Sequence, residues 1–331
     1  MPRRARIDAP EALHHIIGRG IERRDIFSDD EDRDDFLRRL SVLIAETNTS
    51  CFAWALMSNH FHLLLQTGEE SIATLMRRLL TGYAVHFNRR HNRHGALFQN
   101  RYKSLLCQKE SYLLELVRYI HLNPLRAGLV KDLDALDHYG YSGHATLMRQ
   151  KSNPWQDTDF VLQQFSARTL KQASKQYRAF LEQGMGKERP DLIGGGLRRN
   201  QKGWSDAPSG ECVKGDERVL GDAKFVQRVL ASADERLERR IRMRMNGYDL
   251  KRLSRYVEEM LEMPEGTVFA HGRYADIAQA RSLFCYWAVK ELGIKGIELA
   301  KELDLTPSAI SVAIRRGERI AKVNGYTLTG I

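Results

Sequence analysis

The fold is decided by residues 51–66, which read CFAWALMSNHFHLLLQ. Two runs of mainly apolar, strand-forming residues, Cys51–Met57 and His60–Gln66, are separated by the dipeptide Ser58-Asn59. Two such runs joined by a two-residue polar turn are typical of an antiparallel hairpin. The sequence therefore predicts two neighbouring strands joined by a tight turn.

The second run places two histidines on one face of its strand. Because side chains alternate along a strand, His60 and His62 point the same way as Leu64. The other face is apolar and carries Phe61, Leu63 and Leu65. Two imidazoles that face the same way can hold a divalent ion without identifying it. A surface strand that alternates polar and apolar residues has the same spacing, so the pair alone leaves both interpretations open.

The segments on either side of the hairpin predict the fold class. A strand and a helix precede it, a helix and short strands follow it, and a last helix stops at Pro124, which cannot donate within a helix. These segments are Leu13–Gly18, Asp29–Asn48, Ser71–Arg90, Ala96–Gln108 and Glu110–Asn123. Their order predicts an α+β fold over residues 1–150, a ferredoxin-like antiparallel sheet with helices.

The last of these helices carries a candidate nucleophile. Tyr119 and Asn123 lie four residues apart and therefore share a helical face. The amide oxygen of Asn123 would complete a ligand set with the two histidines. A bound ion would polarise a phosphate and lower the tyrosine pKa from about 10, so that the phenolate attacks and forms a phosphotyrosine. Tyr112 and Glu115 lie on the same face and are rival candidates, although Tyr112 is disfavoured because it sits in the first turn, away from Asn123.

Structural roles for the same two residues stay open from the sequence alone. Tyr119 would also suit a packed ring with its hydroxyl at the surface, and Asn123 would suit a helix C-cap before Pro124. Only their combination with the histidines favours a phosphodiester-cleaving site.

Composition and charge indicate a polyanionic partner. The 331 residues include 52 Lys and Arg against 42 Asp and Glu, a net charge of +10. The four cysteines are scattered without a C-x-x-C spacing, which argues against a zinc ribbon or a disulfide framework and fits a reducing cytosol. No apolar run approaches the length of a membrane span, so we expect a protein that is neither secreted nor membrane-spanning.

Beyond residue 150 the sequence predicts two further parts. Residues 151–215 combine a helical segment, Thr158–Glu182, with a glycine-rich linker, Gly184–Gly215, in which Arg198, Arg199 and Lys202 offer positive charge. Residues 216–331 are predicted to form an all-α domain. Its helical segments are Glu217–Met245, Leu250–Met263 and Tyr274–Leu292.

The end of this domain, residues 296–319, has a helix-turn-helix pattern. Thr306 is a suitable N-cap for the second helix, and Pro307 suits its first position. The packing residues are expected to be Ile297, Leu299, Ala300 and Leu303 in the first helix and Ile310, Val312, Ala313 and Ile314 in the second. Ser308, Ser311, Arg315 and Arg316 are then left for DNA. A plain helical hairpin with a solvated basic face is the alternative.

Three stretches together resemble one known family. They read MSNHFHLL at residues 57–64, GALFQNRYK at 95–103 and RYIHLNPLRAGL at 118–129. In this order they resemble the HUH-type single-tyrosine transposases, within them the REP-associated tyrosine transposase branch. The resemblance covers residues 1–150 and implies an HUH nuclease fold. The chain's end is similar to the helix-turn-helix of bacterial replication initiators.

The resemblance also implies roles for individual residues. His60, His62 and Asn123 correspond to the ligands of Mg²⁺ or Mn²⁺, and Tyr119 to the nucleophile. The implied reaction cleaves single-stranded DNA near hairpins through a 5′-phosphotyrosine and leaves a free 3′-OH. Arg19, Gln99 and Arg101 fall in loops that resemble DNA-contacting loops. A bacterial cytosolic, nucleoid-associated protein that binds hairpin and duplex DNA is expected, and some relatives act as homodimers.

Three classes of function remain from the sequence. The first is a transposase-type endonuclease and strand transferase. The second is a non-enzymatic DNA-binding regulator built on an idle transposase domain. A metal-dependent hydrolase without a covalent step is a third.

Overall fold

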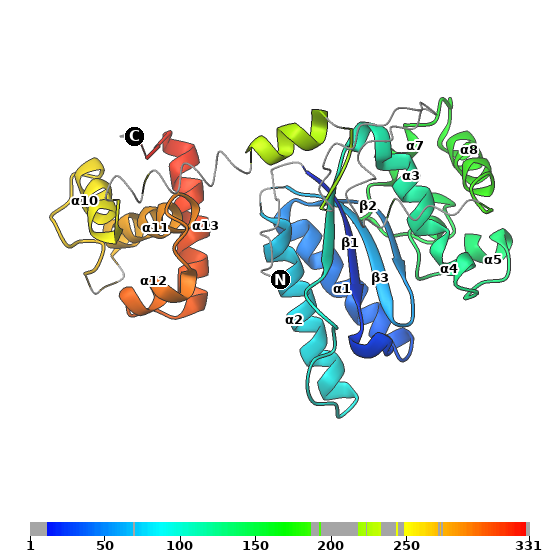
Figure 1. Ribbon diagram of the computed structural model, residues 1–331, viewed down its shortest axis with the longest axis horizontal. Coiled ribbons are helices and arrows are strands. Elements are labelled where there is room, and N and C mark those ends of the chain that lie inside the picture. Colours follow the sequence, from blue (N-terminus) through cyan, green and yellow to red (C-terminus); the bar gives the residue numbers. More distant parts are fainter. Residues whose placement is uncertain are drawn as a thin grey trace, which may run out of the picture. The chain divides into compact units, whose positions relative to one another are not determined.

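The computed structural model describes residues 12–68, 70–186, 192, 218–222, 224–232, 243, 248–270, 272 and 274–328. The chain divides into two compact units, Met1–Val229 and Leu230–Ile331. The first contains a sheet with helices, and the second is helical in its described residues (Figure 1). Most of the predicted linker, with Arg198, Arg199 and Lys202, lies outside the described residues.

A five-stranded sheet forms the centre of the first unit, in the order β2-β3-β1-β4-β5. The strands are β1 (Leu13–Arg19), β2 (Ser50–Leu56), β3 (His60–Gln66), β4 (Lys103–Cys107) and β5 (Val219–Leu220). The first four pair antiparallel, in the ferredoxin-like order that the sequence predicts. β5 pairs parallel with β4, so the sheet is mixed. β5 also lies inside the stretch predicted to be helical, Glu217–Met245, and that part of the prediction is wrong.

Helices cover both faces of this sheet (Figure 1). On one face lie α1 (Asp30–Thr47) and α2 (Ile72–Arg90). Each begins at an N-cap residue, Asp29 or Ser71, whose side chain accepts a hydrogen bond from a backbone amide in the first turn of the helix. Phe61, Leu63 and Leu65 pack beneath them, together with apolar residues of both helices. Leu64 packs on the opposite face, under α3 (Lys109–His121). The predicted alternation along β3 is therefore confirmed.

The helix of the candidate nucleophile ends earlier than predicted. α3 stops at His121, Leu122 is its C-cap, and Asn123 opens a separate short helix, α4 (Asn123–Arg126). Pro124 sits in the first turn of α4, where its missing N–H leaves no intrahelical bond unmade. Asn123 is thus neither the last residue of α3 nor its C-cap.

The rest of the first unit packs short helices against the α3 side. They are α5 (Leu133–Asp137), α6 (His144–Leu147), α7 (Thr158–Leu162) and α8 (Leu170–Glu182). The single helical segment predicted from Thr158 to Glu182 is interrupted between α7 and α8. Tyr177 and Leu181 of α8 are fully buried in the same core as Leu116 and Ile120 of α3.

The second unit contains α10 (Leu250–Met260), α11 (Ala275–Lys290), α12 (Gly296–Glu302) and α13 (Pro307–Asn324). Thr306 caps α13 by accepting a hydrogen bond from the Ala309 amide at 3.2 Å, as predicted. At Gly317 a Cβ atom would lie 1.9 Å from the Ser282 carbonyl oxygen, so α13 approaches α11 closely there.

Two of the packing residues predicted for α12 and α13 are wrong. Ile297 is 65% exposed and Val312 is 56% exposed. Each lies two positions from a buried residue, Leu299 or Ile310, and two positions on a helix are about 200° apart around the axis. The remaining predicted residues are buried or partly buried. No helix among the described residues is both long and apolar enough to cross a lipid bilayer.

Candidate active site

The candidate site begins where β1 and β3 run side by side. Their antiparallel register pairs Arg19 with His60 and Ile17 with His62. The two imidazole rings of β3 lie 5.2 Å apart between centroids. His62 is only 3% exposed, so this strand is not an alternating surface strand, while His60 is half-buried.

Tyr119 reaches the same face from α3. Its ring centroid lies 5.8 Å from that of His62, and the two rings meet edge to face. The Arg126 guanidinium carbon lies 5.6 Å from the centre of the tyrosine ring. Burial raises the pKa of the Tyr119 phenol above its usual value, and the positive charges of Arg126 and Arg19 act in the opposite direction. The structure thus places the predicted nucleophile beside the histidine pair, within the field of two cations.

Asn123 lies at the start of α4, and no hydrogen bond joins it to the histidine pair in the described part of the chain. Its side-chain Nδ2 atom is buried and has no hydrogen-bond partner among the described residues. A buried polar group without a partner costs free energy unless water or a ligand satisfies it. The two rivals on α3 have other surroundings: Tyr112 is buried in the core, and Glu115 pairs with Arg118.

His15 of β1 belongs to the site although the sequence analysis missed it. Its Nε2 atom lies 2.9 Å from Nδ1 of His62, and the two rings stack at 5.2 Å. Its Nδ1 atom lies 3.1 Å from the carbonyl oxygen of Leu192. Two consecutive histidines inside the predicted strand Leu13–Gly18 were a signal, because such strands are normally apolar. Only the strand register shows which of the two meets His62.

Burial favours the neutral form of the three site histidines. It lowers the pKa of His15 to about 4 and, with help from the Arg19 charge, that of His60 to about 4. It also holds the pKa of His62 well below the usual value, and the neighbouring His15, His60 and Arg19 act in the same direction. Neutral imidazoles carry the lone pair that a metal ion requires.

The donor chemistry of His60, His62 and Asn123 suits a divalent cation. Nδ1 of His60 lies 2.6 Å from the side-chain oxygen of Asn59, and Nδ1 of His62 faces His15. The Nε2 atoms of His60 and His62 are therefore left to bind a metal ion, and neither has a hydrogen bond within the described part of the chain. Two imidazole nitrogens with an amide oxygen make a donor set acceptable to several divalent metals.

The predicted DNA-contacting residues of the first unit gather at one end of β1. The backbone N–H of Gln99 donates to the carbonyl oxygen of Arg19 at 2.9 Å, and Phe98 forms an isolated β-bridge with Gly20. Gln99 and Arg101 are exposed. Arg101 lines a groove of about 720 Å³ between α2 and residues 95–102, which Arg77 of α2 also lines.

The other predicted DNA-contacting residues lie on α13 of the second unit. Ser308, Arg315 and Arg316 are exposed. Ser311 is half-buried and donates its hydroxyl to the carbonyl oxygen of Pro307 at 3.0 Å, while the Ser308 hydroxyl lies 2.9 Å from that of Thr306.

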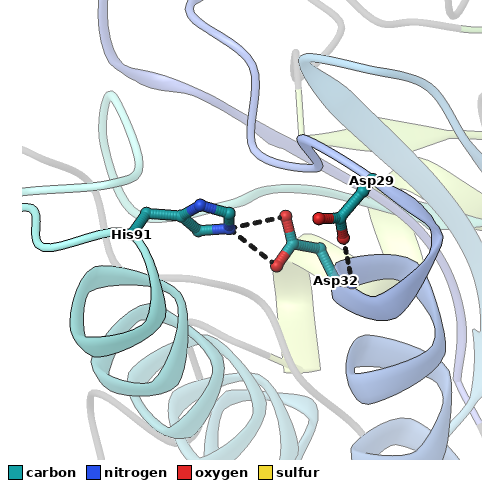
Figure 2. A group of neighbouring side chains, drawn as sticks. All are labelled: Asp29, Asp32 and His91. Carbon is teal, nitrogen blue, oxygen red and sulfur yellow. Dashed lines mark hydrogen bonds and ion pairs between the residues drawn. The ribbon is translucent and has the colours of Figure 1, made fainter.

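A second cluster with metal-ligand chemistry is satisfied by protein groups. Possible ligand atoms of Asp29, Asp32 and His91 lie within 4.8 Å of one another, and Figure 2 shows His91 pointing at the Asp32 carboxylate. Arg90 pairs with both carboxylates at 2.7 Å, and the Asp32 side chain accepts the Ser28 amide at 2.8 Å. The guanidinium already supplies the positive charge, so this cluster fastens the start of α1 to the end of α2.

Comparison with known proteins points to one family. Residues 10–123 match the family model described as "Transposase IS200 like". The match contains His15, His60, His62 and Tyr119, ends at Asn123, and confirms the resemblance to transposases that the motifs predicted.

A solved structure of a REP-associated tyrosine transposase bound to a REP hairpin is similar at 16% sequence identity and a TM-score of 0.38. It covers 46% of this chain and 89% of its own. No protein of curated function matches the chain.

Proposed function

We propose that the first unit is a metal-dependent endonuclease and strand transferase for single-stranded DNA, and that the chain acts as a transposase. One observation carries the proposal. Neutral His60 and His62 lie beside Tyr119 on one face of the sheet, inside the segment that matches the IS200-like transposases.

In the proposed reaction the Tyr119 oxygen attacks a backbone phosphorus. A bond forms between that oxygen and phosphorus, and the bond from phosphorus to the 3′ oxygen breaks. The phenolic proton ends on the leaving oxygen, which yields a free 3′-OH and a 5′-phosphotyrosine. Attack by another 3′-OH on the phosphotyrosine joins two strands and restores Tyr119.

The side chains around the phosphate have distinct tasks. Arg19 and Arg126 counter part of the effect of burial on the pKa of Tyr119 and so favour its phenolate. They would also pair with the phosphate oxygens. His60, His62 and Asn123 would hold Mg²⁺ or Mn²⁺. When bound, such an ion polarises the phosphate and neutralises the charge that develops on it.

The loop residues of the first unit and the exposed polar residues of α13 are proposed to bind DNA. Arg19, Gln99 and Arg101 would follow the single strand next to a hairpin. In the second unit, α12 and α13 would act as a helix-turn-helix on duplex DNA, with Ser308, Ser311, Arg315 and Arg316 toward the groove and backbone.

The test for the covalent step uses the polarity of the product. The full chain is incubated with Mn²⁺ and hairpin oligonucleotides whose single-stranded flanks are randomised, labelled at either the 3′ or the 5′ end. A 5′-phosphotyrosine carries the 3′ label into a denaturation-resistant adduct and releases the 5′ label as a free strand. Tyr119→Phe should abolish the adduct, whereas Tyr112→Phe on the same helix should retain it. Adduct in Tyr119→Phe, or none in the wild type, would overturn the proposal in favour of a binding protein.

The role of α13 is tested separately. Arg315→Ala combined with Arg316→Ala should weaken binding to duplex DNA and reduce the slope of log affinity against log salt by about 2. Adduct formation on short hairpins should not change. Unchanged duplex affinity would favour a plain helical hairpin.

A further inference from the structure

A buried chain of hydrogen bonds runs from the Leu192 carbonyl through His15 to His62. The two links are 3.1 Å and 2.9 Å long. Leu192 and His15 have no exposed surface, and His62 is 3% exposed, so water does not compete for these atoms. The two imidazoles also stack with an interplanar angle of 25°.

The chemistry of the groups fixes the direction of each bond. A carbonyl oxygen only accepts, so Nδ1 of His15 carries the proton that it donates to Leu192. A neutral imidazole has one N–H, so Nε2 of His15 accepts. Nδ1 of His62 must then be the donor in the second bond. It follows that the proton of His62 is on Nδ1 and that its Nε2 atom holds an unshared lone pair.

We propose that His15 is a positioning residue, which accepts from Nδ1 of His62 and thereby holds Nε2 of His62 ready to bind a divalent cation. The role of the cation rests on the function proposed above, but the tautomer does not. Partners of this kind set both the ring orientation and the proton position of metal-ligating histidines.

His60 reaches the same state by a different route. Its Nδ1 atom faces the side-chain oxygen of the adjacent Asn59 at 2.6 Å, so it too is the donor. That partner is the preceding residue in the chain, whereas His15 comes from another strand and is itself oriented by Leu192. The tautomer of His60 is therefore set by the neighbouring residue in the sequence, and that of His62 by a contact between two strands.

The direct test reads the tautomer in metal-free protein. The full chain is labelled with ¹⁵N-histidine, treated with a chelator and examined by long-range ¹H–¹⁵N correlation spectra, with His62 assigned from a His62→Gln variant. We expect the proton of His62 on Nδ1 and a bare Nε2. A proton on Nε2, or a mixture of the two forms, would overturn the assignment whether or not the protein cleaves DNA.

A second measurement tests the consequence for binding, with Mn²⁺ alone as the probe in calorimetric titrations. His15→Phe keeps a ring but removes the acceptor, and should weaken Mn²⁺ binding by about 10–100-fold. His15→Gln restores an acceptor and should bring the affinity back to within a few-fold of the wild type. His14→Phe is the matched control, because His14 is equally buried but bonds Ser104 at 3.1 Å.

The outcomes separate this inference from the proposed function. Equal Mn²⁺ affinity in wild type and His15→Phe would overturn the positioning role even if the wild type forms the phosphotyrosine adduct. Correct tautomer and weakened binding in His15→Phe would support it even if no adduct forms.

Discussion

Two histidine clusters lie against α3, and they differ in how their hydrogen bonds end. In the open cluster, made of His15, His60 and His62 beside Tyr119, the chain of donors finishes at bare Nε2 atoms on the face of the sheet that α3 covers. Nothing within the described residues bonds those atoms. The cluster therefore keeps its lone pairs for a ligand.

The closed cluster is built from the same residue types. One end of it reaches charged groups, and at the other end Nε2 of His121 is buried without a hydrogen-bond partner among the described residues. His121 and His144 each place Nδ1 2.8 Å from the Tyr177 hydroxyl, and Nε2 of His144 lies 2.8 Å from a carboxylate oxygen of Asp137. Arg178 donates to the other Asp137 oxygen at 2.8 Å. The pair of clusters teaches that a bare imidazole nitrogen does not by itself make a ligand site. Nε2 of His121 is a single such atom in the core, whereas His60 and His62 lie side by side on one strand face next to Tyr119.

Exchanging one histidine in each cluster should separate these roles most widely. His62→Gln removes a proposed ligand, and adduct formation should fall by more than about 100-fold, the upper end of the cost of losing an outer partner. His144→Gln should lower it by less than about 10-fold. Initial rates of adduct formation with a 3′-labelled hairpin provide the measurement. Equal losses in the two variants would mean that the clusters do not divide their roles in this way.

Adding or removing metal should act on the open cluster alone. Mn²⁺ at 100 times its Kd should raise the free energy of unfolding of the first unit by about 2.7 kcal/mol, because it binds only the folded state. The increment should persist in His144→Gln and vanish in His62→Gln or after chelation. Urea unfolding with and without Mn²⁺ checks this. An increment that survives in His62→Gln would place the ion elsewhere, for example at Asp29, Asp32 and His91.

Removing one tyrosine hydroxyl at each cluster should affect stability at the closed cluster and not at the open one. Tyr177→Phe leaves two buried imidazole nitrogens without their partner and should lower the free energy of unfolding by about 1–3 kcal/mol. Tyr119→Phe should change it by less than about 0.5 kcal/mol, because no hydrogen bond to its hydroxyl is found in the described part of the chain. Urea unfolding of both variants measures the difference. A larger loss in Tyr119→Phe would show that its hydroxyl is structural.

Local patterns were enough to predict the order of helices and strands along the chain and the positions of the open cluster's main residues. The period of two in His60–Gln66 and the turn at Ser58-Asn59 predict the hairpin, because they depend only on neighbouring residues. Tyr119 was found from its helical spacing. His15 could not be assigned, since its role depends on a register with β3 and on a carbonyl 177 residues away in the chain.

Elements held by distant contacts were missed for the same reason. β5 is only two residues long and exists because it pairs with β4, so no local period marks it. The end of α3 was placed two residues too late, because Pro124 suits the first turn of a new helix as well as the end of an old one. The exposure of Val312 follows from the face that α13 turns to α11, which the sequence of α13 alone does not define.

The pH dependence of the free energy of unfolding should also differ between the clusters, and this is the smallest of the expected effects. Burial lowers the pKa of His144, despite the nearby Asp137, and lowers the pKa of His15 and His60 to about 4. In the unfolded chain histidine takes up its proton near pH 6.5, so the unfolded state binds more protons below that pH. The free energy of unfolding should therefore fall as the pH is lowered from 6.5 toward 4, with contributions from both clusters.

Below that window Asp137 of the closed cluster should add a response of its own. Burial acts to raise the pKa of Asp137, but hydrogen bonds from His144 and Arg178 outweigh it and hold that pKa below the ordinary value of 3.8. A depressed carboxyl pKa stabilises the fold above the unfolded value, and that stability is lost as the pH falls through the folded value. Asp137→Asn should therefore flatten the decline below pH 3.8 and leave the decline between 6.5 and 4 in place. Urea unfolding from pH 3 to pH 7 in both proteins measures the two limbs. An unchanged lower limb in Asp137→Asn would show that Asp137 does not complete the closed cluster as a charge.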